Sequence, residues 1–435
     1  MIEQLYQLYL SSSGITTDTR NIGNGTVFFA LKGETFNANL FAAEALEKGA
    51  AYAVVDEIAK AEWKEKFGNK LILVADVLKT LQQLAGHHRQ QLQSPVLAIT
   101  GSNGKTTTKE LIAAVLSKKF KTYATKGNLN NHIGIPLTLL SIKEDVQFAV
   151  IEMGANHVGE IASYCDYVKP DYGLITNVGM AHTEGFGGFE GVVKGKTELY
   201  KDIKKRNGKV FVNADNQLLV DKLEANEYSG SDIITYGTSA VSYCLGKIGE
   251  SKEFLSVITE GVTIQTNLVG EYNFENVMSA VCVGKYFDVA SADIKEAIEH
   301  YIPTNNRSQK IAIGSNTIIL DAYNANPSSM IEALKNFEKV ESRNKISILG
   351  QMMELGVYSA TEHQKIVAAV SGRGWEEVIK VFVGKGFEFL KNDSTVLWFE
   401  KTEDVKAWFK QQQFENSYIL IKGSRKNELE KILKD

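Results

Sequence analysis

The chain has 435 residues, of which 44% are hydrophobic and 23% are charged, and it carries a formal net charge of −4. This composition is typical of a globular protein with two to four domains, at roughly 100–200 residues per domain. We expect no nucleic-acid partner, because the overall charge does not favour a polyanion, and no stable membrane insertion, because no apolar run approaches the ~20 residues that span a bilayer.

The N-terminal stretch MIEQLYQLYLSSSG does not resemble an export signal. It carries an acid near its start and a polar residue every few positions, whereas a signal peptide has a basic start and an uninterrupted apolar core. Cys165, Cys244 and Cys282 are far apart and form no C-x-x-C pair, so we expect buried free thiols rather than a zinc site or disulfides. Both features predict a cytoplasmic protein.

Segments typical of strands and of helices alternate along nearly the whole chain. Several short runs are rich in Val, Ile and Phe and end at Gly or Asp, as strands do before a turn. The expected strands include residues 25–31, 51–56, 70–76, 146–154, 172–179, 209–215 and 316–323, and the expected helices include residues 39–50 and 77–92. Asp76 is the expected N-cap of the second helix. This alternation predicts an α/β fold with mostly parallel strands.

Two polar stretches, residues 87–95 and 301–310, separate three blocks of this pattern. We therefore expect domain boundaries close to them. The three expected domains are residues 1–94, 95–308 and 309–435, and each lies within or near the usual size of a domain.

The segment VLAITGSNGKTTTKELI reads as a strand, a glycine-bearing turn and a helix. Gly101 and Gly104 provide backbone without side chains, so that N–H groups and the positive end of the following helix can cradle an anion. Lys105 would reach the terminal phosphates of a nucleotide, and the Thr106 hydroxyl is a candidate ligand for Mg²⁺. The usual spacing G-x-x-x-x-G-K-[ST] requires a glycine at Ile99, so we expect a variant loop rather than that of a GTPase or motor ATPase. The alternative is a plain strand–turn–helix with a chance Gly-Lys-Thr.

The loop TGSNGKTTTKE resembles the ATP loop of the Mur ligases and of the related folylpolyglutamate synthetases. These enzymes activate a carboxylate as an acyl phosphate and then join it to an amine. The resemblance implies ATP and Mg²⁺ as cofactors. It also implies a nucleotide-binding loop made of Thr100, Gly101, Ser102, Asn103, Gly104, Lys105, Thr106 and Thr107.

Three residues outside the loop are expected to take part in catalysis together with the loop lysine. Glu152 ends an apolar strand, where a carboxylate is well placed to bind a metal. His182 follows the next strand in ITNVGMAHTEGFGG. In KGKTELY the resemblance points to Lys196, rather than Lys194, as the lysine that is typically carbamoylated in Mur ligases. It implies one Mg²⁺ on the loop threonine and Glu152, and a second on His182 and the modified lysine. A solvated acid, a structural histidine and a surface lysine are the alternatives.

Further segments resemble the surroundings of the nucleotide in Mur ligases. In GEYNFENVMSA two asparagines lie one helical turn apart, and an amide can both donate to and accept from the edge of adenine. NNRSQ resembles the family's linker with its arginine, and LDAYNANPSSM resembles a third-domain loop that closes over ATP, with a strand-end aspartate suited to the ribose hydroxyls. The residues implied are Asn273, Asn276, Arg307, Asp321, Tyr323 and Asn326. Capping asparagines and a plain turn are the alternatives.

The N-terminal block, TTDTRNIGNGTVFFALKGETFNANLF and its continuation, resembles the UDP-binding domain of Mur ligases that act late in their pathway. Asn37 and Asn39 depart from the pattern common among relatives, which leaves the sugar and peptide contacts open. The residues implied to bind this substrate, with ordinary turn residues as the alternative, are Thr17, Asp18, Thr19, Arg20, Lys32, Gly33, Asn37, Asn130 and Asn131.

The motifs follow the order of the family along essentially the whole chain. The resemblance therefore implies an N-terminal UDP-substrate domain, a central P-loop-type ATPase domain with a mostly parallel sheet, and a Rossmann-like C-terminal domain. DAYNANP, KGNLNNHIGIPLTLL, GQMMELG and KGSR favour the member that ligates D-alanyl-D-alanine to UDP-N-acetylmuramoyl-tripeptide, which forms the UDP-muramoyl-pentapeptide precursor of peptidoglycan. Gln351 stands in GQMMELG where relatives often have Asp, whereas Glu354 fits the pattern.

Three alternatives stay open beside this function. They are the ligase that adds the third stem residue, folylpolyglutamate synthetase, and an inactive binding homologue. DAYNANP disfavours the first, the UDP-type N-terminal block disfavours the second, and the intact set of catalytic residues disfavours the third. We expect a monomer, and the sequence does not decide whether the tripeptide ends in lysine or in diaminopimelate.

Overall fold

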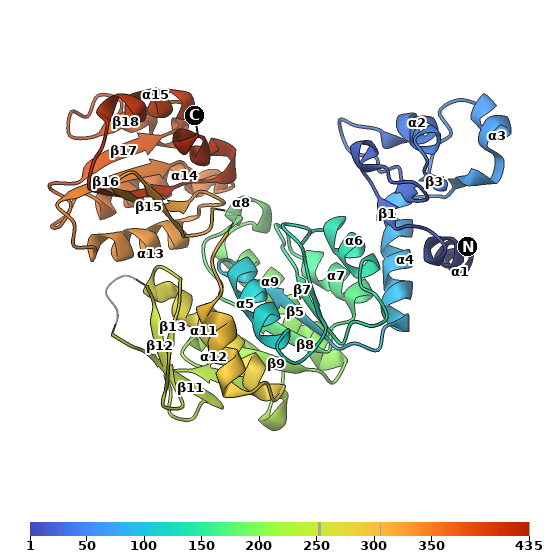
Figure 1. Ribbon diagram of the computed structural model, residues 1–435, viewed down its shortest axis with the longest axis horizontal. Helices are drawn as coiled ribbons and strands as arrows, with labels where there is room; N and C mark the ends of the chain where they lie inside the picture. Colours follow the sequence, from blue (N-terminus) through green and yellow to red (C-terminus); the bar gives the residue numbers. More distant parts are fainter. Residues whose placement is uncertain (251–253, 305, 435) are drawn as a thin grey trace.

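The computed structural model describes residues 1–250, 254–304 and 306–434, and it contains three separate β-sheets with helices around each. Figure 1 shows the part of the chain with the first sheet and the part with the third at opposite ends of the molecule, with the second sheet between them. Strands and helices alternate and most neighbouring strands are parallel, which confirms the α/β fold with three domains.

The first sheet has four parallel strands in the order β1-β2-β3-β4. Its strands are β1 (Ile15–Thr16), β2 (Val27–Phe29), β3 (Tyr52–Val55) and β4 (Leu71–Leu73), and its helices are α1 (Ile2–Leu10), α2 (Ala42–Glu47) and α3 (Glu62–Phe67). The side chains of β2 are all buried, as expected for a parallel strand covered on both faces.

Helix α4 (Val77–Gln91) joins the first sheet to the second. Asp76 caps its N-terminus, as predicted, by accepting a 2.8 Å hydrogen bond from the backbone N–H of Lys79. The polar stretch expected at a domain boundary includes the last turns of this helix, where His88 and Arg89 are buried. Arg89 donates to the carbonyl oxygen of Val168 (3.0 Å), so α4 is fixed against the second sheet's helices rather than forming an open linker.

The second sheet has nine strands in the order β13-β12-β11-β10-β9-β8-β5-β7-β6. The first two pairings in this order, β13 with β12 and β12 with β11, are antiparallel. The strands are β5 (Val96–Thr100), β6 (Thr122–Ala124), β7 (Phe148–Glu152), β8 (Tyr172–Ile175), β9 (Lys209–Asn213), β10 (Ile233–Gly237), β11 (Cys244–Ile248), β12 (Ser256–Thr259) and β13 (Val262–Gln265).

Two layers of helices cover the second sheet. One face carries α5 (Lys105–Leu116), α11 (Phe274–Tyr286) and α12 (Ser291–Glu299). The other face carries α4, α6 (Gly134–Leu140), α7 (Glu160–Val168) and α9 (Phe189–Lys205). Two further short helices are α8 (Thr183–Phe186) and α10 (Gln217–Glu224). Residues of β5 alternate between the two apolar layers, so this central strand is buried on both faces.

The third sheet has six strands in the order β14-β15-β19-β16-β17-β18, and only the β14–β15 pair among them is antiparallel. Its strands are β14 (Gln309–Ile313), β15 (Asn316–Asp321), β16 (Asn344–Gly350), β17 (Ile379–Val383), β18 (Leu397–Phe399) and β19 (Ser417–Lys422), and its helices are α13 (Pro327–Glu338), α14 (Ser359–Ala369) and α15 (Thr402–Gln412).

The three cysteines are free and buried, as the sequence predicts. Across the described residues, no helix combines the length and the apolar character required to cross a bilayer.

Candidate active site

The glycine loop lies at the carboxyl edge of the second sheet, directly after β5. Strands β7 and β8 flank β5 on either side, so the loop meets the residues that follow both of them. The backbone N–H of Asn103 donates to the side-chain oxygen of Asn177 (3.0 Å), and that of Ser102 donates to the Asn177 carbonyl oxygen (2.9 Å). The crevice at the carboxyl ends of parallel strands is where α/β proteins bind ligands.

Both loop glycines are required by their surroundings. Gly101 has a φ of +144°, and a Cβ there would lie 2.0 Å from the Thr176 hydroxyl oxygen. Gly104 has a φ of +77°, and a Cβ there would lie 2.4 Å from the side-chain oxygen of Asn276. Ile99, where the usual motif has glycine, is a fully buried residue of β5 that pairs with Glu152. The strand therefore extends into the position that a longer loop would occupy.

Lys105 is the first residue of α5 and turns back over the loop. Its ammonium group donates to the carbonyl oxygens of Gly101 (2.6 Å) and Ser102 (3.1 Å). Removal from water lowers the pKa of Lys105 to about 8, with the nearby Glu152 acting in the opposite sense. A lysine in this position is suited to bind a phosphate. The loop carbonyls accept its hydrogen bonds but carry no full negative charge, which an anion would supply.

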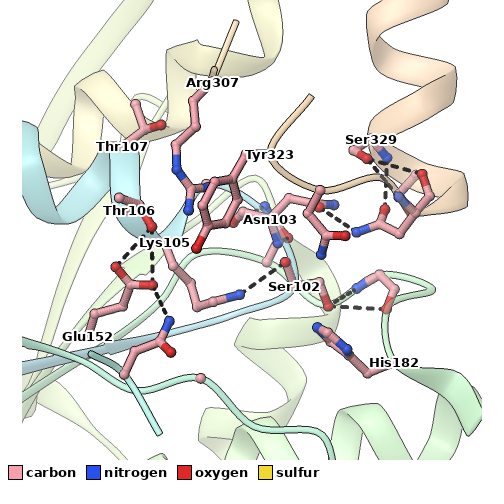
Figure 2. Close-up of a pocket in the computed structure, with 18 of the residues that line it drawn as sticks. Ser102, Asn103, Lys105, Thr106, Thr107, Glu152, His182, Arg307, Tyr323 and Ser329 are labelled. Carbon is pink, nitrogen blue, oxygen red and sulfur yellow. Dashed lines mark hydrogen bonds between the residues drawn. The ribbon is translucent and has the colours of Figure 1, made fainter. Parts of the chain in front are cut away.

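Thr106 and Glu152 form a hydrogen-bonded pair beside the lysine (Figure 2). The Thr106 hydroxyl lies 3.1 and 3.0 Å from the two carboxylate oxygens of Glu152, and the side-chain amide of Asn130 donates to one of them (2.7 Å). Glu152 ends β7 and is 1% exposed. A buried carboxylate with these partners has its orientation fixed before any ligand arrives.

The donors at this point fit Mg²⁺. A hydroxyl oxygen and a carboxylate are hard oxygen ligands, and Mg²⁺ commonly takes one or two such protein ligands and completes its shell with phosphate and water. In the described ranges there is no cluster of three or more His, Cys, Asp or Glu side chains that would hold a metal without a nucleotide. The chemistry of the site therefore suits a cation that is shared with bound phosphates.

His182 lies on the opposite side of Lys105 from the Thr106–Glu152 pair in the view of Figure 2. It precedes α8 and has a positive φ of 55°. Its Nδ1 makes a short contact with the carboxylate of Glu354, and hydrogen bonding to His182 lowers the pKa of Glu354. Glu354 follows β16 in the third sheet's unit, so this pair joins two parts of the chain that are 172 residues apart.

The structure separates the two candidate lysines of α9. Lys194 is exposed, whereas Lys196 is completely buried and donates to the carbonyl oxygen of Ala155 (3.0 Å). Burial, and next the charge of Lys105, holds the pKa of Lys196 well below its usual value. Lys196 does not line the cavity described below. An uncharged amine is nevertheless the form that reacts with CO₂.

Asn273 and Asn276 are linked to the loop helix by a chain of hydrogen bonds. Thr108 on α5 donates to the side-chain oxygen of Asn276 (3.0 Å), and the Asn276 amide donates to Asn273 (2.9 Å). Both asparagines are buried at the start of α11. Between them Glu275 faces the same cavity, and burial raises its pKa to about 7, with Asp215 adding to the effect.

The third sheet's unit contributes the opposite wall. Asn326 caps α13 and donates from its amide to the side-chain oxygen of Asn103 in the glycine loop (2.7 Å). The guanidinium of Arg307 stacks on the ring of Tyr323, with 3.6 Å between its central carbon and the ring centroid (Figure 2). Asp321, at the end of β15, pairs with the buried ammonium of Lys422 at 2.5 Å.

These elements enclose one cavity of about 840 Å³. Most of the predicted nucleotide, metal and catalytic residues line it. They are Ser102, Asn103, Gly104, Lys105, Thr106, Thr107, Glu152, His182, Asn273, Asn276, Arg307, Asp321, Tyr323 and Asn326. Two residues predicted to bind the UDP-linked substrate, Asn130 and Asn131, also line it. Thr100 and Gly101 do not line it, since the Thr100 hydroxyl is buried and donates to the Met153 carbonyl oxygen (2.7 Å).

The predicted substrate residues of the N-terminal unit lie outside this cavity. Asp18 accepts hydrogen bonds from Arg20, and Asn37 caps a short 3-10 helix while also donating to Glu57. Asn39 is fully buried and donates to Asp56 (2.7 Å). Asn37 and Asn39 thus have local structural roles, Asn37 as a cap and Asn39 as a buried donor. The predicted substrate residues of this unit, all outside the cavity, are Thr17, Asp18, Thr19, Arg20, Lys32, Gly33 and Asn37.

Several residues at or beside the site were not predicted. Lys109 lies one turn after Lys105 and is buried beside Glu152, and the i, i+4 spacing within the loop helix was the available signal. Lys422 was part of the KGSR motif, but only the sheet register places it opposite Asp321. Glu275 had no signal, because its significance depends on burial between elements.

Comparison with known proteins agrees with this geometry. Three family models match successive parts of the chain: the Mur ligase family catalytic domain at residues 11–89, the Mur ligase middle domain at 99–284, and the Mur ligase glutamate ligase domain at 306–425.

Individual relatives match over nearly their whole length. The UDP-N-acetylmuramoyl-tripeptide–D-alanyl-D-alanine ligase of Bacillus subtilis is 35% identical over 97% of this chain and 92% of its own, and the Escherichia coli enzyme of the same name is 32% identical over 98% and 94%. A crystal structure of MurF from Acinetobacter baumannii superimposes with a TM-score of 0.86 at 28% identity and covers 100% of this chain and 97% of its own. The chain therefore belongs to the Mur ligase family.

Proposed function

We propose that this protein is the ATP-dependent ligase that joins D-alanyl-D-alanine to UDP-N-acetylmuramoyl-tripeptide and so forms the UDP-muramoyl-pentapeptide precursor of peptidoglycan. The name shared by the two relatives that match over nearly their whole length supports this function. The observation that carries it is the cavity in which the glycine loop, the strand-end Glu152 and the DAYNANP segment converge. Such a cavity could hold ATP beside the carboxylate of the tripeptide, with residues of the third sheet's unit forming one of its walls.

The reaction requires activation of a carboxylate, which is a poor electrophile. Transfer of the γ-phosphoryl group of ATP to the tripeptide carboxylate gives an acyl phosphate, and attack by the amine of D-alanyl-D-alanine then forms the amide and releases phosphate. Two anions must approach each other in the first step. Lys105 and Arg307 are the cavity cations placed to offset that repulsion and to stabilise charge in the transition state.

The remaining cavity residues would position the nucleotide. The loop N–H groups and the start of α5 would hold the phosphates, and the fixed amides of Asn273 and Asn276 would face the adenine. Asp321, oriented by Lys422, would accept from the ribose hydroxyls. Thr106 and Glu152 would hold Mg²⁺, which supplies charge neutralisation of the phosphates when bound.

Lys196 is proposed to carry a carbamate and, with His182, to hold a second Mg²⁺. Its neutral amine can add to CO₂ with loss of a proton, which converts a buried base into an anion. The lowered pKa of Lys196 supports this step, because it favours the uncharged amine, which is the form that reacts with CO₂. Incubation with ¹³C-bicarbonate should give a carbamate carbon signal in NMR spectra that is absent from the Lys196→Ala variant. Identical spectra for the two proteins would show that Lys196 carries no carbamate.

The N-terminal unit would bind the UDP end of the substrate through Thr17, Asp18, Thr19, Arg20, Lys32, Gly33 and Asn37. The resemblance of this unit to the UDP-binding domain supports the assignment, as does the match of residues 11–89. The three domains are then residues 1–94, 95–308 and 309–435. We expect the enzyme to act as a monomer in the cytoplasm, because ATP is available there.

The test is phosphate release with ATP, UDP-muramoyl tripeptide and D-alanyl-D-alanine, with each omitted in turn. The proposed function predicts that release requires all three. Release without D-alanyl-D-alanine, or with a free amino acid as acceptor in its place, would assign the chain to another ligase of the family. Running the assay with both the lysine and the diaminopimelate tripeptide would also identify the third residue.

A further inference from the structure

Lys109 occupies an unusual place behind the nucleotide cavity. It lies on α5 one turn after Lys105, and its side chain is 2% exposed. Its ammonium group is 3.7 Å from a carboxylate oxygen of Glu152 and 3.6 Å from one of Glu110. These separations are those of an ion pair rather than of a direct hydrogen bond. A buried ammonium requires such partners, because an unpaired charge is strongly disfavoured away from water.

Lys109 differs from the hydrogen-bond partners of Glu152 because it does not line the cavity. Thr106 and Asn130, which hold the carboxylate, both line the cavity, whereas Lys109 does not. A ligand in the cavity can therefore contact the carboxylate but not the ammonium group of Lys109.

The acids around Glu152 do not outnumber the bases. Two carboxylates, Glu152 and Glu110, face two ammonium groups, Lys109 and Lys105, and Arg307 adds a further positive charge near Lys105. A divalent cation that approaches alone is attracted by the acids and repelled by the bases. The triphosphate of a nucleotide adds several negative charges, and the balance then favours the cation.

We propose that Lys109 makes binding of the divalent cation at Glu152 conditional on a bound nucleotide. It is a positioning residue, since it acts through Glu152 and does not reach the cavity. The inference rests on the proposed function only in taking the cavity as a nucleotide site. Its consequence is that the enzyme does not hold the metal before ATP arrives, which avoids a tightly fixed cation that would have to be rearranged when the phosphates enter.

The test removes the charge and measures metal binding without nucleotide. Mn²⁺, which takes the same oxygen ligands as Mg²⁺, is titrated into the nucleotide-free protein and followed by electron paramagnetic resonance. The Lys109→Met variant should bind Mn²⁺ about tenfold or more tightly than the unmodified protein, because one repelling charge close to the site is gone. Mn²⁺ alone should also raise the Tm of this variant more than that of the unmodified protein.

Two further variants control for trivial effects. Lys118→Met removes a lysine just beyond the C-terminus of the same helix, which pairs with Glu296, and it should leave Mn²⁺ binding unchanged. Lys109→Met combined with Glu152→Gln removes both charges of the pair, and it should fold without Mn²⁺ and lose the gained affinity. If Lys109→Met folds only when Mn²⁺ is present, the metal has replaced the ammonium as the inference requires.

The inference is overturned if Lys109→Met binds Mn²⁺ no more tightly than the unmodified protein, or if it stays unfolded at saturating Mn²⁺ while the double variant folds. This failure differs from that of the proposed function. If the unmodified protein binds no Mn²⁺ even with a non-hydrolysable ATP analogue, the cavity is not the nucleotide site. If it binds Mn²⁺ together with the analogue, but Lys109→Met gains no affinity for Mn²⁺ alone, only the role of Lys109 is lost.

Discussion

Two titratable side chains at the nucleotide cavity have pKa values that burial moves toward neutrality. Desolvation lowers the pKa of Lys105 to about 8 and raises that of Glu275 to about 7. In both cases removal from water disfavours the charged form, and the charge of Asp215 adds to the effect at Glu275. If the proposed function is correct, a phosphate beside Lys105 would favour the charged form of the lysine.

Glu275 makes stability depend on pH in a defined direction. Its pKa is higher in the folded protein than in the unfolded chain, so stability is lost as the pH rises from about 4.5 to about 7. Glu275→Gln should therefore stabilise the nucleotide-free protein by about 2 kcal/mol at about pH 8 and have little effect at about pH 4. Denaturant unfolding at the two pH values measures this difference. The exposed Glu224→Gln should change neither value, and an equal effect of both variants would refute the assignment.

At the scale of elements, the loop after β5 and the helices α5 and α11 act as one unit. Gly104 can have no side chain because Asn276 of α11 approaches it, and Thr108 of α5 donates to that same asparagine. The phosphate cradle and the residues proposed for adenine are thus held by one hydrogen-bond chain. A change at the loop should be transmitted to the adenine side of the cavity.

Gly104→Ala should weaken ATP binding by about tenfold or more. The new methyl group would meet Asn276 at a φ that disfavours alanine, and the loop or the asparagine must move. Fluorescent-nucleotide titration measures the affinity. Gly261→Ala is the matched control, because it has a φ of +78° but no atom within 4 Å of the added carbon, and it should lose only stability. Equal affinities in the two variants would contradict the close approach.

The elements near the site also show what the sequence could and could not predict. Helix α4 and its Asp76 cap were predicted correctly, since both depend on local pattern and capping chemistry. The burial of Arg89 was not, because the carbonyl groups that satisfy it come from residues about 80 positions away. The ion pair of Lys109 with Glu152 was not predicted either, because it depends on the register of β5 against β7. Motifs located the cavity, and tertiary contacts supplied the partners of its charged residues.

At the scale of the whole molecule, the cavity is closed by contacts between two domains. Asn326 binds Asn103 across this interface, Glu354 meets His182, and the Thr183 hydroxyl donates to the Leu355 carbonyl oxygen at 3.4 Å. These contacts are polar, and apolar packing accompanies them, since Val269 of the second sheet's unit is buried in the core cluster of the third sheet's unit. Figure 1 shows the part of the chain with the first sheet at the other end of the molecule from the third sheet's unit.

Asn326→Asp separates the two tasks of this residue. The side-chain oxygen that caps α13 is kept, with its acceptor bond from the Ser329 N–H (3.0 Å), while the donor to Asn103 is lost. We expect unchanged thermal stability but a KM for ATP that is higher by about tenfold, together with a larger radius of gyration in solution scattering. Asn326→Ala, which removes the cap as well, should also lower the Tm. A normal KM in Asn326→Asp would mean that the bridge does not hold the closed state.

The most direct test of the proposed reaction follows the oxygen atoms of the tripeptide carboxylate. UDP-muramoyl tripeptide labelled with heavy oxygen in its terminal carboxyl group is converted in the presence of ATP and D-alanyl-D-alanine, and the phosphate and peptide are analysed by mass spectrometry. Formation of an acyl phosphate predicts a pentapeptide product and one labelled oxygen in each released phosphate. A pentapeptide formed with unlabelled phosphate, or phosphate released without a pentapeptide, would contradict the account.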